Sequence, residues 1–389
     1  MTPIDSPTRD LLESVARATR LREGAEGVAA VLRAVYRAES SSLQDVAREA
    51  RLPLPVTTAI RRELEKAGLL DRRHGLSLSP DGRRYVEQVL GFAGRPTSTC
   101  GTCDGIGLIP PPAATARLAE LLASAPPVDV TLDQAICTPD TALRRAALMY
   151  EAGAVEGRRL LILGDDDSIS IAVCLLFKSV AGRLPDHPIT VVELDPRRVA
   201  FLQAIARQEQ FPIDVVEHDL REPLPSPLVR HFDVFETDPP YTSAGARLFL
   251  SRATEALDPG VTGMGFLSYA QRPAQEMLEL QRLCYDLRLA ITALRPGFNR
   301  YQGASVLGSA GQLFELVAMP GDPHDPLDAW RGPLYSAEVN PRTRRYRCKA
   351  CGAVATLGEH GVPETIEALK TSGCPACAGR TFHRLSGQH

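Results

Sequence analysis

Lysine, tryptophan and long apolar runs are scarce in this sequence of 389 residues. Aromatic residues make up 5% of the chain, with one Trp, and 4 of the 44 basic side chains are lysines. The preference for arginine reflects codon usage more than function. No run of 18 apolar residues occurs, which excludes a membrane-spanning helix. The first ten residues carry Asp5 and no apolar stretch, so we expect no secretory signal and a cytoplasmic protein.

The length and the charge distribution indicate several domains. A chain of 389 residues with 44% hydrophobic residues is expected to form two or three domains with large cores. The formal net charge of −3 is a sum of unlike parts, because residues 1–95 carry +3, residues 96–340 carry −11 and residues 341–389 carry +5. An acidic middle suits a cationic substrate better than a phosphate backbone.

The first segment, residues 1–95, predicts a winged-helix-like domain. Apolar residues recur at helical spacing over 26–38, and two more helices, a short alternating wing and a last helix follow. In one interpretation Arg61, Arg62 and Lys66 contact DNA. We favour a packing or dimerisation role, since fold does not fix function and a charge of +3 is small.

A single C-x-x-C pair, Cys100 and Cys103, lies in a predicted linker over residues 96–140. In a cytosolic chain such pairs indicate metal binding rather than disulfides. Two thiolates are half of a structural zinc site, so the other ligands would come from a symmetry mate or from elsewhere in the chain, with Cys137 as one candidate. Unmetallated thiols at a turn fit the pattern equally well.

Residues 141–320 alternate strand-like and helix-like stretches, which predicts an α/β domain with a doubly wound sheet. Seven strands are expected, all parallel except the last. This count and order match the Rossmann-like, methyltransferase-type sheet of enzymes that use sulfonium nucleosides. The predicted strands cover residues 159–167, 188–195, 213–220, 231–241, 261–270, 287–296 and 311–320.

Acidic side chains follow four of these strands, where a ligand binds in such a sheet. The acid after the second strand, Glu193, is placed to accept the ribose hydroxyls, and Asp219 to accept the adenine amino group. Three aspartates after the first strand create a negative potential that attracts an ammonium group. Helix capping explains one of the three. The acids are Asp165, Asp166 and Asp167 after Gly164, then Glu193, Asp219 and Asp238.

The fourth strand ends in Asp238-Pro239-Pro240-Tyr241. The two prolines stiffen a loop that would hold Asp238 and Tyr241 over the reacting centre. Such a motif occurs where an amine nitrogen attacks the carbon of a sulfonium. The carboxylate accepts a hydrogen bond from the amine, and the ring offers a cation–π contact.

The C-terminal part predicts a zinc ribbon over residues 346–383, after a linker over 321–345. Two C-x-x-C pairs are separated by 22 residues, a spacing typical of a four-thiolate zinc site. A module this small cannot bury a sufficient core, so the zinc would be structural. The four ligands would be Cys348, Cys351, Cys374 and Cys377.

The sequence over roughly residues 25–320 resembles the branched-chain polyamine synthase family, whose members aminopropylate spermidine. The resemblance rests on the Gly-Asp-Asp-Asp, Glu-Leu-Asp and Asp-Pro-Pro-Tyr motifs, and on the segment from Cys100 to Gly107. It implies transfer of an aminopropyl group from decarboxylated S-adenosylmethionine to a polyamine nitrogen, with release of 5′-methylthioadenosine. It also implies a homodimer.

The resemblance implies a role for each motif residue. Gly164, Asp165, Glu193 and Asp219 would bind the donor, whereas Asp166, Asp167, Asp238 and Tyr241 would bind the amine. Among these, Asp238 would orient and deprotonate the attacking nitrogen, with Tyr241 against it, and these two would be the catalytic residues.

Two departures from the family pattern concern the acceptor. Thr237 replaces the usual Gly before the Asp-Pro-Pro motif, and a zinc ribbon stands where a short acidic tail is expected. The acceptor therefore need not be spermidine itself. Phe298, Tyr301, Tyr335 or the ribbon would shape its site.

Two other functions use the same motifs differently. An amino-methyltransferase acting on DNA or RNA would explain the basic ends and the Asp-Pro-Pro-Tyr motif, but not three aspartates after the first strand or the acidic middle. A non-catalytic regulator that senses an adenosyl ligand would not need the site acids. Nucleic acid is therefore a less favoured partner than a polyamine.

Overall fold

The computed structural model describes residues 7–38, 42–71, 76–94, 98–99, 108–302, 310–321, 327–339, 344–357 and 366–385. The chain forms two compact units. The first comprises Met1–Val128, Ala135–Pro239 and Ala246–Trp330, and the second comprises Asp129–Gln134, Pro240–Gly245 and Arg331–His389. No helix in the described ranges is long and apolar enough to cross a membrane.

The N-terminal elements follow the predicted order. A buried cluster that includes Val31, Leu32 and Ile60 holds them together. The first helix, α1, was not predicted. The winged-helix assignment itself stays a prediction. The elements are α1 (Pro7–Thr19), α2 (Gly24–Arg37), α3 (Leu43–Glu49), α4 (Leu54–Lys66), β1 (Leu70–Asp71), β2 (Ser77–Leu78) and α5 (Pro80–Gln88).

Ion pairs attach this N-terminal module to the rest of the first unit. The Arg37 guanidinium donates to Glu151 at 2.8 Å and to Glu156 at 3.0 Å, and it stacks 4.2 Å from the centre of the Tyr150 ring. Arg158 pairs with Glu26 of α2. These partly buried contacts favour the packing interpretation of the module.

The basic side chains of α4 are mostly neutralised within the helix. Arg61 is buried and donates to Glu65 at 3.0 Å, and Lys66 donates to Glu63 at 2.7 Å. Arg62 is exposed. The α4 helix therefore offers few free cations for DNA contact.

The segment predicted as a linker, 96–140, contains ordered structure. A short hairpin of β3 (Ser98–Thr99) and β4 (Leu108–Ile109) precedes helix α6 (Pro112–Leu122). The helix buries apolar residues spaced three to four apart, which is the pattern that could have predicted it. These buried residues are Ala114, Leu118 and Leu121.

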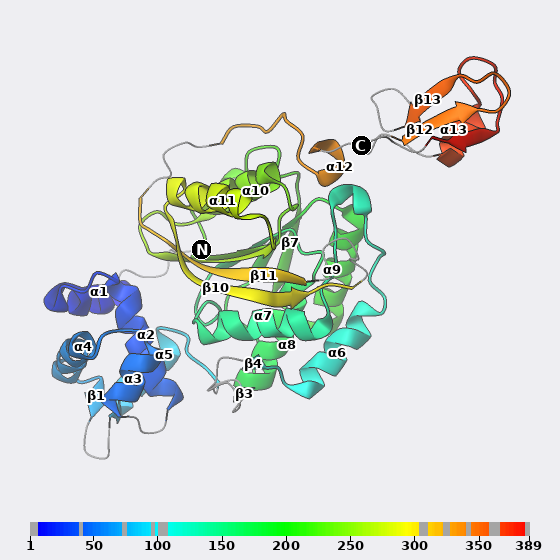
Figure 1. Ribbon diagram of the computed structural model, residues 1–389. Helices are drawn as coiled ribbons and strands as arrows, with labels where there is room; N and C mark the ends of the chain where they lie inside the picture. The colour runs from blue at the N-terminus through cyan, green and yellow to red at the C-terminus, as the bar shows by residue number, and fades with distance from the viewer. Residues whose placement is uncertain are drawn as a thin grey trace. The chain divides into compact units, whose positions relative to one another are not determined.

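The seven predicted strands of the central domain are present. They lie in the order β10-β11-β9-β8-β5-β6-β7, and β11 is antiparallel to both of its neighbours, as predicted. Figure 1 shows α7 and α8 on one face of the sheet and α10 and α11 on the other. The strands are β5 (Leu160–Leu163), β6 (Ile189–Glu193), β7 (Ile213–Glu217), β8 (Val234–Thr237), β9 (Gly263–Ala270), β10 (Leu289–Arg300) and β11 (Ala310–Ala318).

Helices connect these strands and cover their apolar faces. All four side chains of β5 and of β8 are buried, as expected for central parallel strands. The helices are α7 (Pro139–Glu151), α8 (Ile169–Ala181), α9 (Pro196–Glu209), α10 (Ser243–Ala256) and α11 (Ala274–Asp286).

The C-terminal ribbon is a three-stranded antiparallel sheet with one helix. The strand order is β13-β12-β14, and Tyr346, Ala355, Leu357 and Leu369 form its small core. A short helix, α12 (Ser336–Val339), precedes it. The ribbon elements are β12 (Arg344–Cys348), β13 (Val354–Leu357), α13 (Ile366–Ser372) and β14 (Phe382–Arg384).

Candidate active site

The acids predicted after β5, β6 and β8 come together at one edge of the sheet. These three strands are parallel neighbours, so their carboxyl ends meet there. Glu193, which ends β6, accepts the backbone N–H of Asp165 at 2.9 Å. Thr237, which ends β8, donates its hydroxyl to the carbonyl of Leu163 at 2.9 Å. Thr237, which replaces the usual Gly of the family pattern, thus links β8 to β5 at the position that precedes Asp238.

The turn after β5 requires two left-handed residues. Gly164 has φ +72° and Ser168 has φ +57°. A side chain at Gly164 would be strained by this φ value. The turn places the three aspartates between the end of β5 and the start of α8, and each of them has a different environment.

Asp165 caps helix α8. Its carboxylate is fully buried and accepts the N–H of Ile169 and both the N–H and the hydroxyl of Ser170. Burial raises its pKa well above the ordinary value, although these hydrogen bonds oppose the shift. Both carboxylate oxygens are engaged by the helix, so Asp165 meets the capping role expected of one of the three acids.

Asp167 pairs with Arg145, a residue that the sequence reasoning missed. Arg145 lies on α7, is 1% exposed, and donates to Asp167 and to Glu236 of β8. It also lies 3.5 Å from Asp238 Oδ2. Glu236 lies in an apolar strand that is fully buried, and a buried carboxylate needs a cationic partner. The presence of Glu236 in the sequence of this strand could therefore have predicted a buried basic residue such as Arg145.

Asp238 has one occupied and one free oxygen. Oδ2 accepts the hydroxyl of Tyr301 at 2.6 Å, whereas Oδ1 is buried and has no hydrogen-bond partner within the described part of the chain. Burial raises the pKa of Asp238 to about 7, despite the opposing effects of Arg145 and of the Tyr301 hydrogen bond. A buried acceptor without a donor is costly unless a ligand supplies one.

Asp166 is the most accessible of the three aspartates. It is partly exposed and accepts the N–H of Ala135 at 3.0 Å. Burial raises its pKa well above the ordinary value, and the charges of Asp167, Asp238 and Glu193 raise it further. These carboxylates are therefore close enough to repel one another, and a cation between them would relieve the repulsion.

The predicted nucleoside-binding acids lie along β6 and β7. Glu193 is 5% exposed, and its oxygens also accept the N–H groups of Leu194 at 2.8 Å and Asp195 at 2.9 Å. Asp195 caps α9, as predicted, by accepting the N–H of Arg197. Asp219 is half-buried and accepts the N–H of Arg221 at 2.9 Å.

The predicted aromatic residues are distributed over both units. Tyr241 and Tyr335 belong to the second unit, where Thr242 donates to the carbonyl of Leu334 at 2.7 Å. Phe298 belongs to the first unit, and the Arg144 guanidinium lies 4.4 Å from its ring centre. The role of Tyr241 beside Asp238 stays a prediction.

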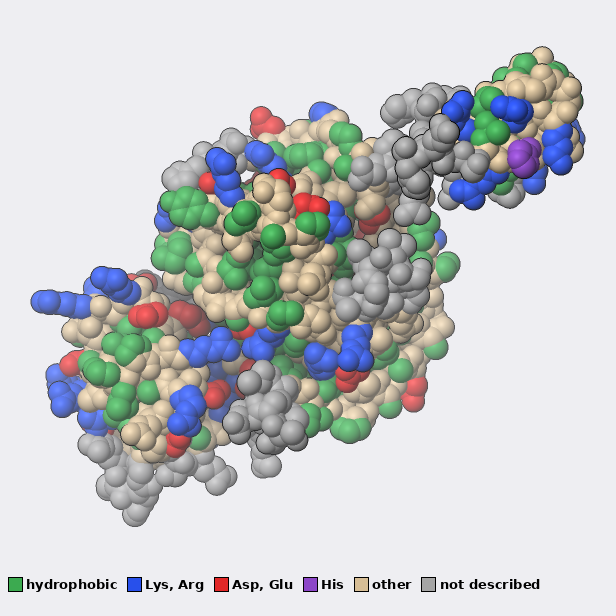
Figure 2. All heavy atoms as spheres, in the orientation of Figure 1, with side chains coloured by type: hydrophobic (Ala, Val, Ile, Leu, Met, Phe, Trp, Pro, Cys, Tyr) green, Lys and Arg blue, Asp and Glu red, His purple; other side chains and the backbone are tan. Residues whose placement is uncertain are grey.

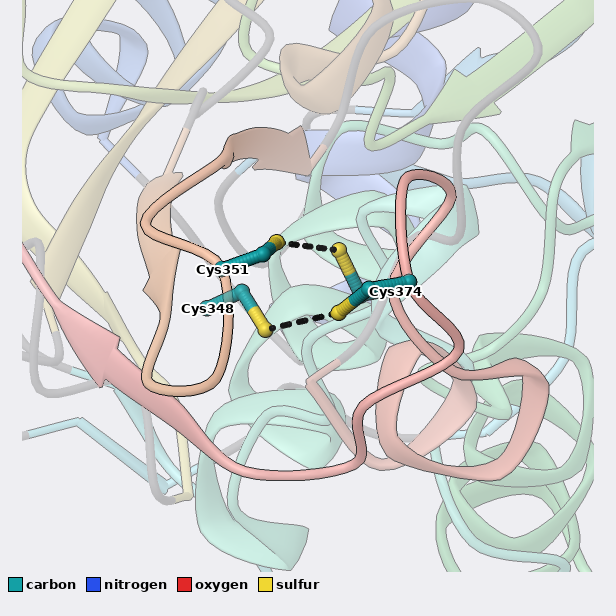
Figure 3. Close-up of side chains that lie close together, drawn as sticks. Cys348, Cys351 and Cys374 are labelled. Atoms are coloured by element: carbon teal, nitrogen blue, oxygen red, sulfur yellow. Dashed lines mark hydrogen bonds between the residues drawn. The ribbon is translucent and has the colours of Figure 1, made fainter.

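The four cysteines of the ribbon converge. Their sulfur atoms all lie within 4.8 Å of one another, with Sγ–Sγ distances of 3.6 Å between Cys348 and Cys377 and 3.7 Å between Cys351 and Cys374 (Figure 3). Cys100 and Cys103 lie outside the described residues, and Cys137 is buried in the first unit, where its N–H donates to Asp167.

A pocket of about 520 Å³ lies at the opposite edge of the sheet. It is lined by the segments before β8 and β9, including Arg230 and Asp258, and it contains none of the predicted site residues. The carboxylate cluster, with its free acceptor oxygen, is therefore the candidate site.

The sequence matches a known family. The model of the branched-chain polyamine synthase A C-terminal domain matches residues 114–320. The chain belongs to the branched-chain polyamine synthase family. A solved member, the branched-chain polyamine synthase of Thermus thermophilus in complex with N4-aminopropylspermidine and 5′-methylthioadenosine, is 28% identical. It superposes with a TM-score of 0.54 over 85% of this chain and 97% of that chain.

Two relatives of this family come from Methanocaldococcus jannaschii. One is named N(4)-bis(aminopropyl)spermidine synthase and is 33% identical over 255 residues, which is 64% of this chain and 70% of the relative. The other, a protein of uncharacterised function, is 34% identical over 384 residues, which is 96% of this chain and 92% of the relative. The match to the second relative thus spans nearly the whole of both chains.

Proposed function

We propose that the protein transfers an aminopropyl group from decarboxylated S-adenosylmethionine to a nitrogen of a spermidine-like polyamine, giving a branched product and 5′-methylthioadenosine. The observation that carries this proposal is the free, buried Oδ1 of Asp238 within a cluster of carboxylates. An amine N–H is the donor that this oxygen lacks.

The electrostatics of the site favour the decarboxylated donor. Arg145, the buried cation of the cluster, is already paired with Asp167 and Glu236. No free cation among the described site residues remains to bind the carboxylate of ordinary S-adenosylmethionine. The ammonium end of the decarboxylated form would instead be attracted by the cluster.

The donor would lie across the carboxyl ends of β5, β6 and β7. Glu193 would accept the ribose hydroxyls and Asp219 the adenine amino group, while the left-handed Gly164 lets the backbone approach the ligand. We assign Asp165 a supporting part in donor binding, because its carboxylate fixes the turn and the start of α8.

The acceptor amine would lie between Asp166 and Asp238, with Tyr241 against it. Asp166 would hold an ammonium group, and Asp167 would act on the amine through its charge while it holds Arg145 in place. Asp238 Oδ1 would accept the N–H of the attacking nitrogen. At neutral pH a carboxyl with a pKa of about 7 is partly ionised and can take that proton.

The reaction would be a direct displacement. The amine nitrogen attacks the carbon next to the sulfonium, the carbon–sulfur bond breaks, and its electrons remain on the sulfur of 5′-methylthioadenosine. The proton of the attacking nitrogen passes to Asp238. The cationic sulfonium is already a good leaving group, so this step requires no metal.

Two relatives from one organism bear on the identity of the acceptor amine. M. jannaschii contains a named spermidine-modifying synthase and, separately, the full-length relative of this chain. Two family members in one organism are expected to act on different acceptors, so the acceptor of this chain need not be spermidine itself. We propose a spermidine-like polyamine as the acceptor class and test it with a panel of linear polyamines.

The four ribbon cysteines would hold a structural zinc ion. A tetrahedral site with Zn–S bonds of about 2.3 Å places its sulfur atoms about 3.8 Å apart. The Sγ–Sγ distances of 3.6 and 3.7 Å fit this geometry.

We also propose that the protein acts as a homodimer, which light scattering of the purified protein would test.

Mass spectrometry of the reaction mixture tests the proposed activity. The purified protein is incubated with decarboxylated S-adenosylmethionine and each polyamine, and 5′-methylthioadenosine and a heavier amine are expected together. The Asp238→Asn variant, which keeps the shape of the side chain, should form neither product. If methyl transfer to DNA or RNA from ordinary S-adenosylmethionine occurs instead, the alternative amino-methyltransferase function is correct.

A further inference from the structure

The outer face of the ribbon sheet carries exposed cations in a regular row. On β12, Tyr346 and Cys348 point into the core, so the alternate residues Arg345 and Arg347 point outward, and both are exposed. His383 of β14 is the register partner of Arg347 and is also exposed. We call Arg345, Arg347 and His383 the basic face.

The structure shows no ion-pair partner for the cations of the basic face among the residues that it describes. Neither arginine of this face has a carboxylate partner among the residues that the structure describes, and the same holds for the exposed Lys349, Arg380 and Arg384 nearby. Figure 2 shows Lys and Arg side chains gathered over the described part of the ribbon.

Two exposed arginines of the N-terminal helices, in contrast, each have a carboxylate partner. Arg17 lies 3.3 Å from Glu13 and Arg83 lies 3.3 Å from Glu87, each on its own helix. Uncompensated cations on a small sheet repel one another, and an external polyanion would relieve that repulsion.

The composition of this face indicates the kind of polyanion. A membrane-binding surface carries large apolar residues beside its cations, and a protein interface core is rich in aromatic residues and poor in charge. The strand neighbours of Arg347 and Arg345 across the register are Val354, an exposed aliphatic residue, and Thr356, so these neighbours offer one apolar side chain and no aromatic one. Alternate strand residues are about 7 Å apart, which gives a flat row of cations suited to successive phosphates, and the His383 ring can stack on a base.

We propose that the basic face of the ribbon binds the sugar–phosphate backbone of nucleic acid. This proposal does not rest on the transfer reaction. The surface differs from the winged-helix contact considered from the sequence, where Arg61 and Lys66 of α4 are paired with acids of their own helix. Binding should depend on salt, since each phosphate neutralised by a cation releases counterions.

Salt-dependent binding of a short single-stranded RNA to the full, zinc-loaded protein tests the proposal. The Arg345→Gln/Arg347→Gln variant should bind more weakly. The slope of log K against log salt should fall in magnitude by about 1.4, at about 0.7 for each lost phosphate contact. The matched control is Arg17→Gln/Arg48→Gln, which removes two exposed charges from the N-terminal domain and should leave the slope unchanged.

Zinc content and the circular dichroism spectrum of the ribbon variant are measured alongside and should equal those of the parent protein. Three results would overturn the proposal. These are no RNA binding by the parent protein at low salt, an equal loss in the control variant, or displacement of the RNA by poly-glutamate at equal charge concentration. The last result would indicate an acidic protein partner.

Discussion

Replacing Tyr301 by Phe should shift the pH dependence of the reaction without changing the shape of the site. The Tyr301 hydroxyl donates to Asp238 Oδ2 at 2.6 Å, a bond that favours the ionised carboxylate. A hydrogen bond to a charged group contributes about 1.5–3 kcal/mol, and one pKa unit corresponds to about 1.4 kcal/mol. Loss of the bond should therefore raise the pKa of Asp238 by about one to two units from about 7.

The assay is the pH profile of kcat/KM with saturating donor. In the parent protein the rate should rise as Asp238 ionises near pH 7, and in the variant the rise should occur between about pH 8 and 9. The variant should be about 10- to 100-fold slower at low pH and should regain most of its rate at high pH. An unchanged profile with a uniformly lower rate would refute the role of Tyr301 in setting the Asp238 pKa.

Three other changes test separate parts of the account. Asp238→Asn should lower turnover by about 10²–10⁴-fold while donor binding by calorimetry is retained. Because burial raises the folded-state pKa of Asp238 to about 7, the unfolded chain ionises first, and the Asp238 carboxyl costs stability progressively as the pH rises from its ordinary pKa to about 7. The stability gained by this variant should therefore be larger at pH 8 than at pH 5. Arg145→Met should lose about 3–5 kcal/mol of stability by leaving buried carboxylates unpaired, whereas Arg145→Lys should lose less; equal losses in denaturant melts would contradict the pairing. Cys348→Ser with Cys374→Ser should abolish zinc binding in metal analysis, and retention of one zinc per chain would disprove the ribbon site.

Local patterns were enough to predict the sheet. Each strand was marked by its apolar run and each helix by its spacing, and the antiparallel position of β11 followed from the methyltransferase-type order. The strand-end acids were located for the same reason, since the carboxyl ends of β5, β6 and β8 must meet once the order is known.

The pairing of the site residues could not be predicted in this way. Arg145 and Tyr301 are distant from Asp238 in the sequence, and only tertiary packing brings them to its Oδ2 atom. The three consecutive aspartates looked equivalent, yet Asp165 caps α8 and Asp167 binds Arg145. Their different environments arise from the left-handed turn at Gly164 and Ser168, which no periodicity encodes.

A donor competition tests the central claim most directly. The protein is given equal amounts of ordinary and decarboxylated S-adenosylmethionine with a spermidine-like polyamine, and the nucleoside products are identified by mass spectrometry. The carboxylate cluster, with its one buried cation already paired, predicts 5′-methylthioadenosine and an aminopropylated amine. Formation of S-adenosylhomocysteine and a methylated acceptor, without 5′-methylthioadenosine, would contradict the account.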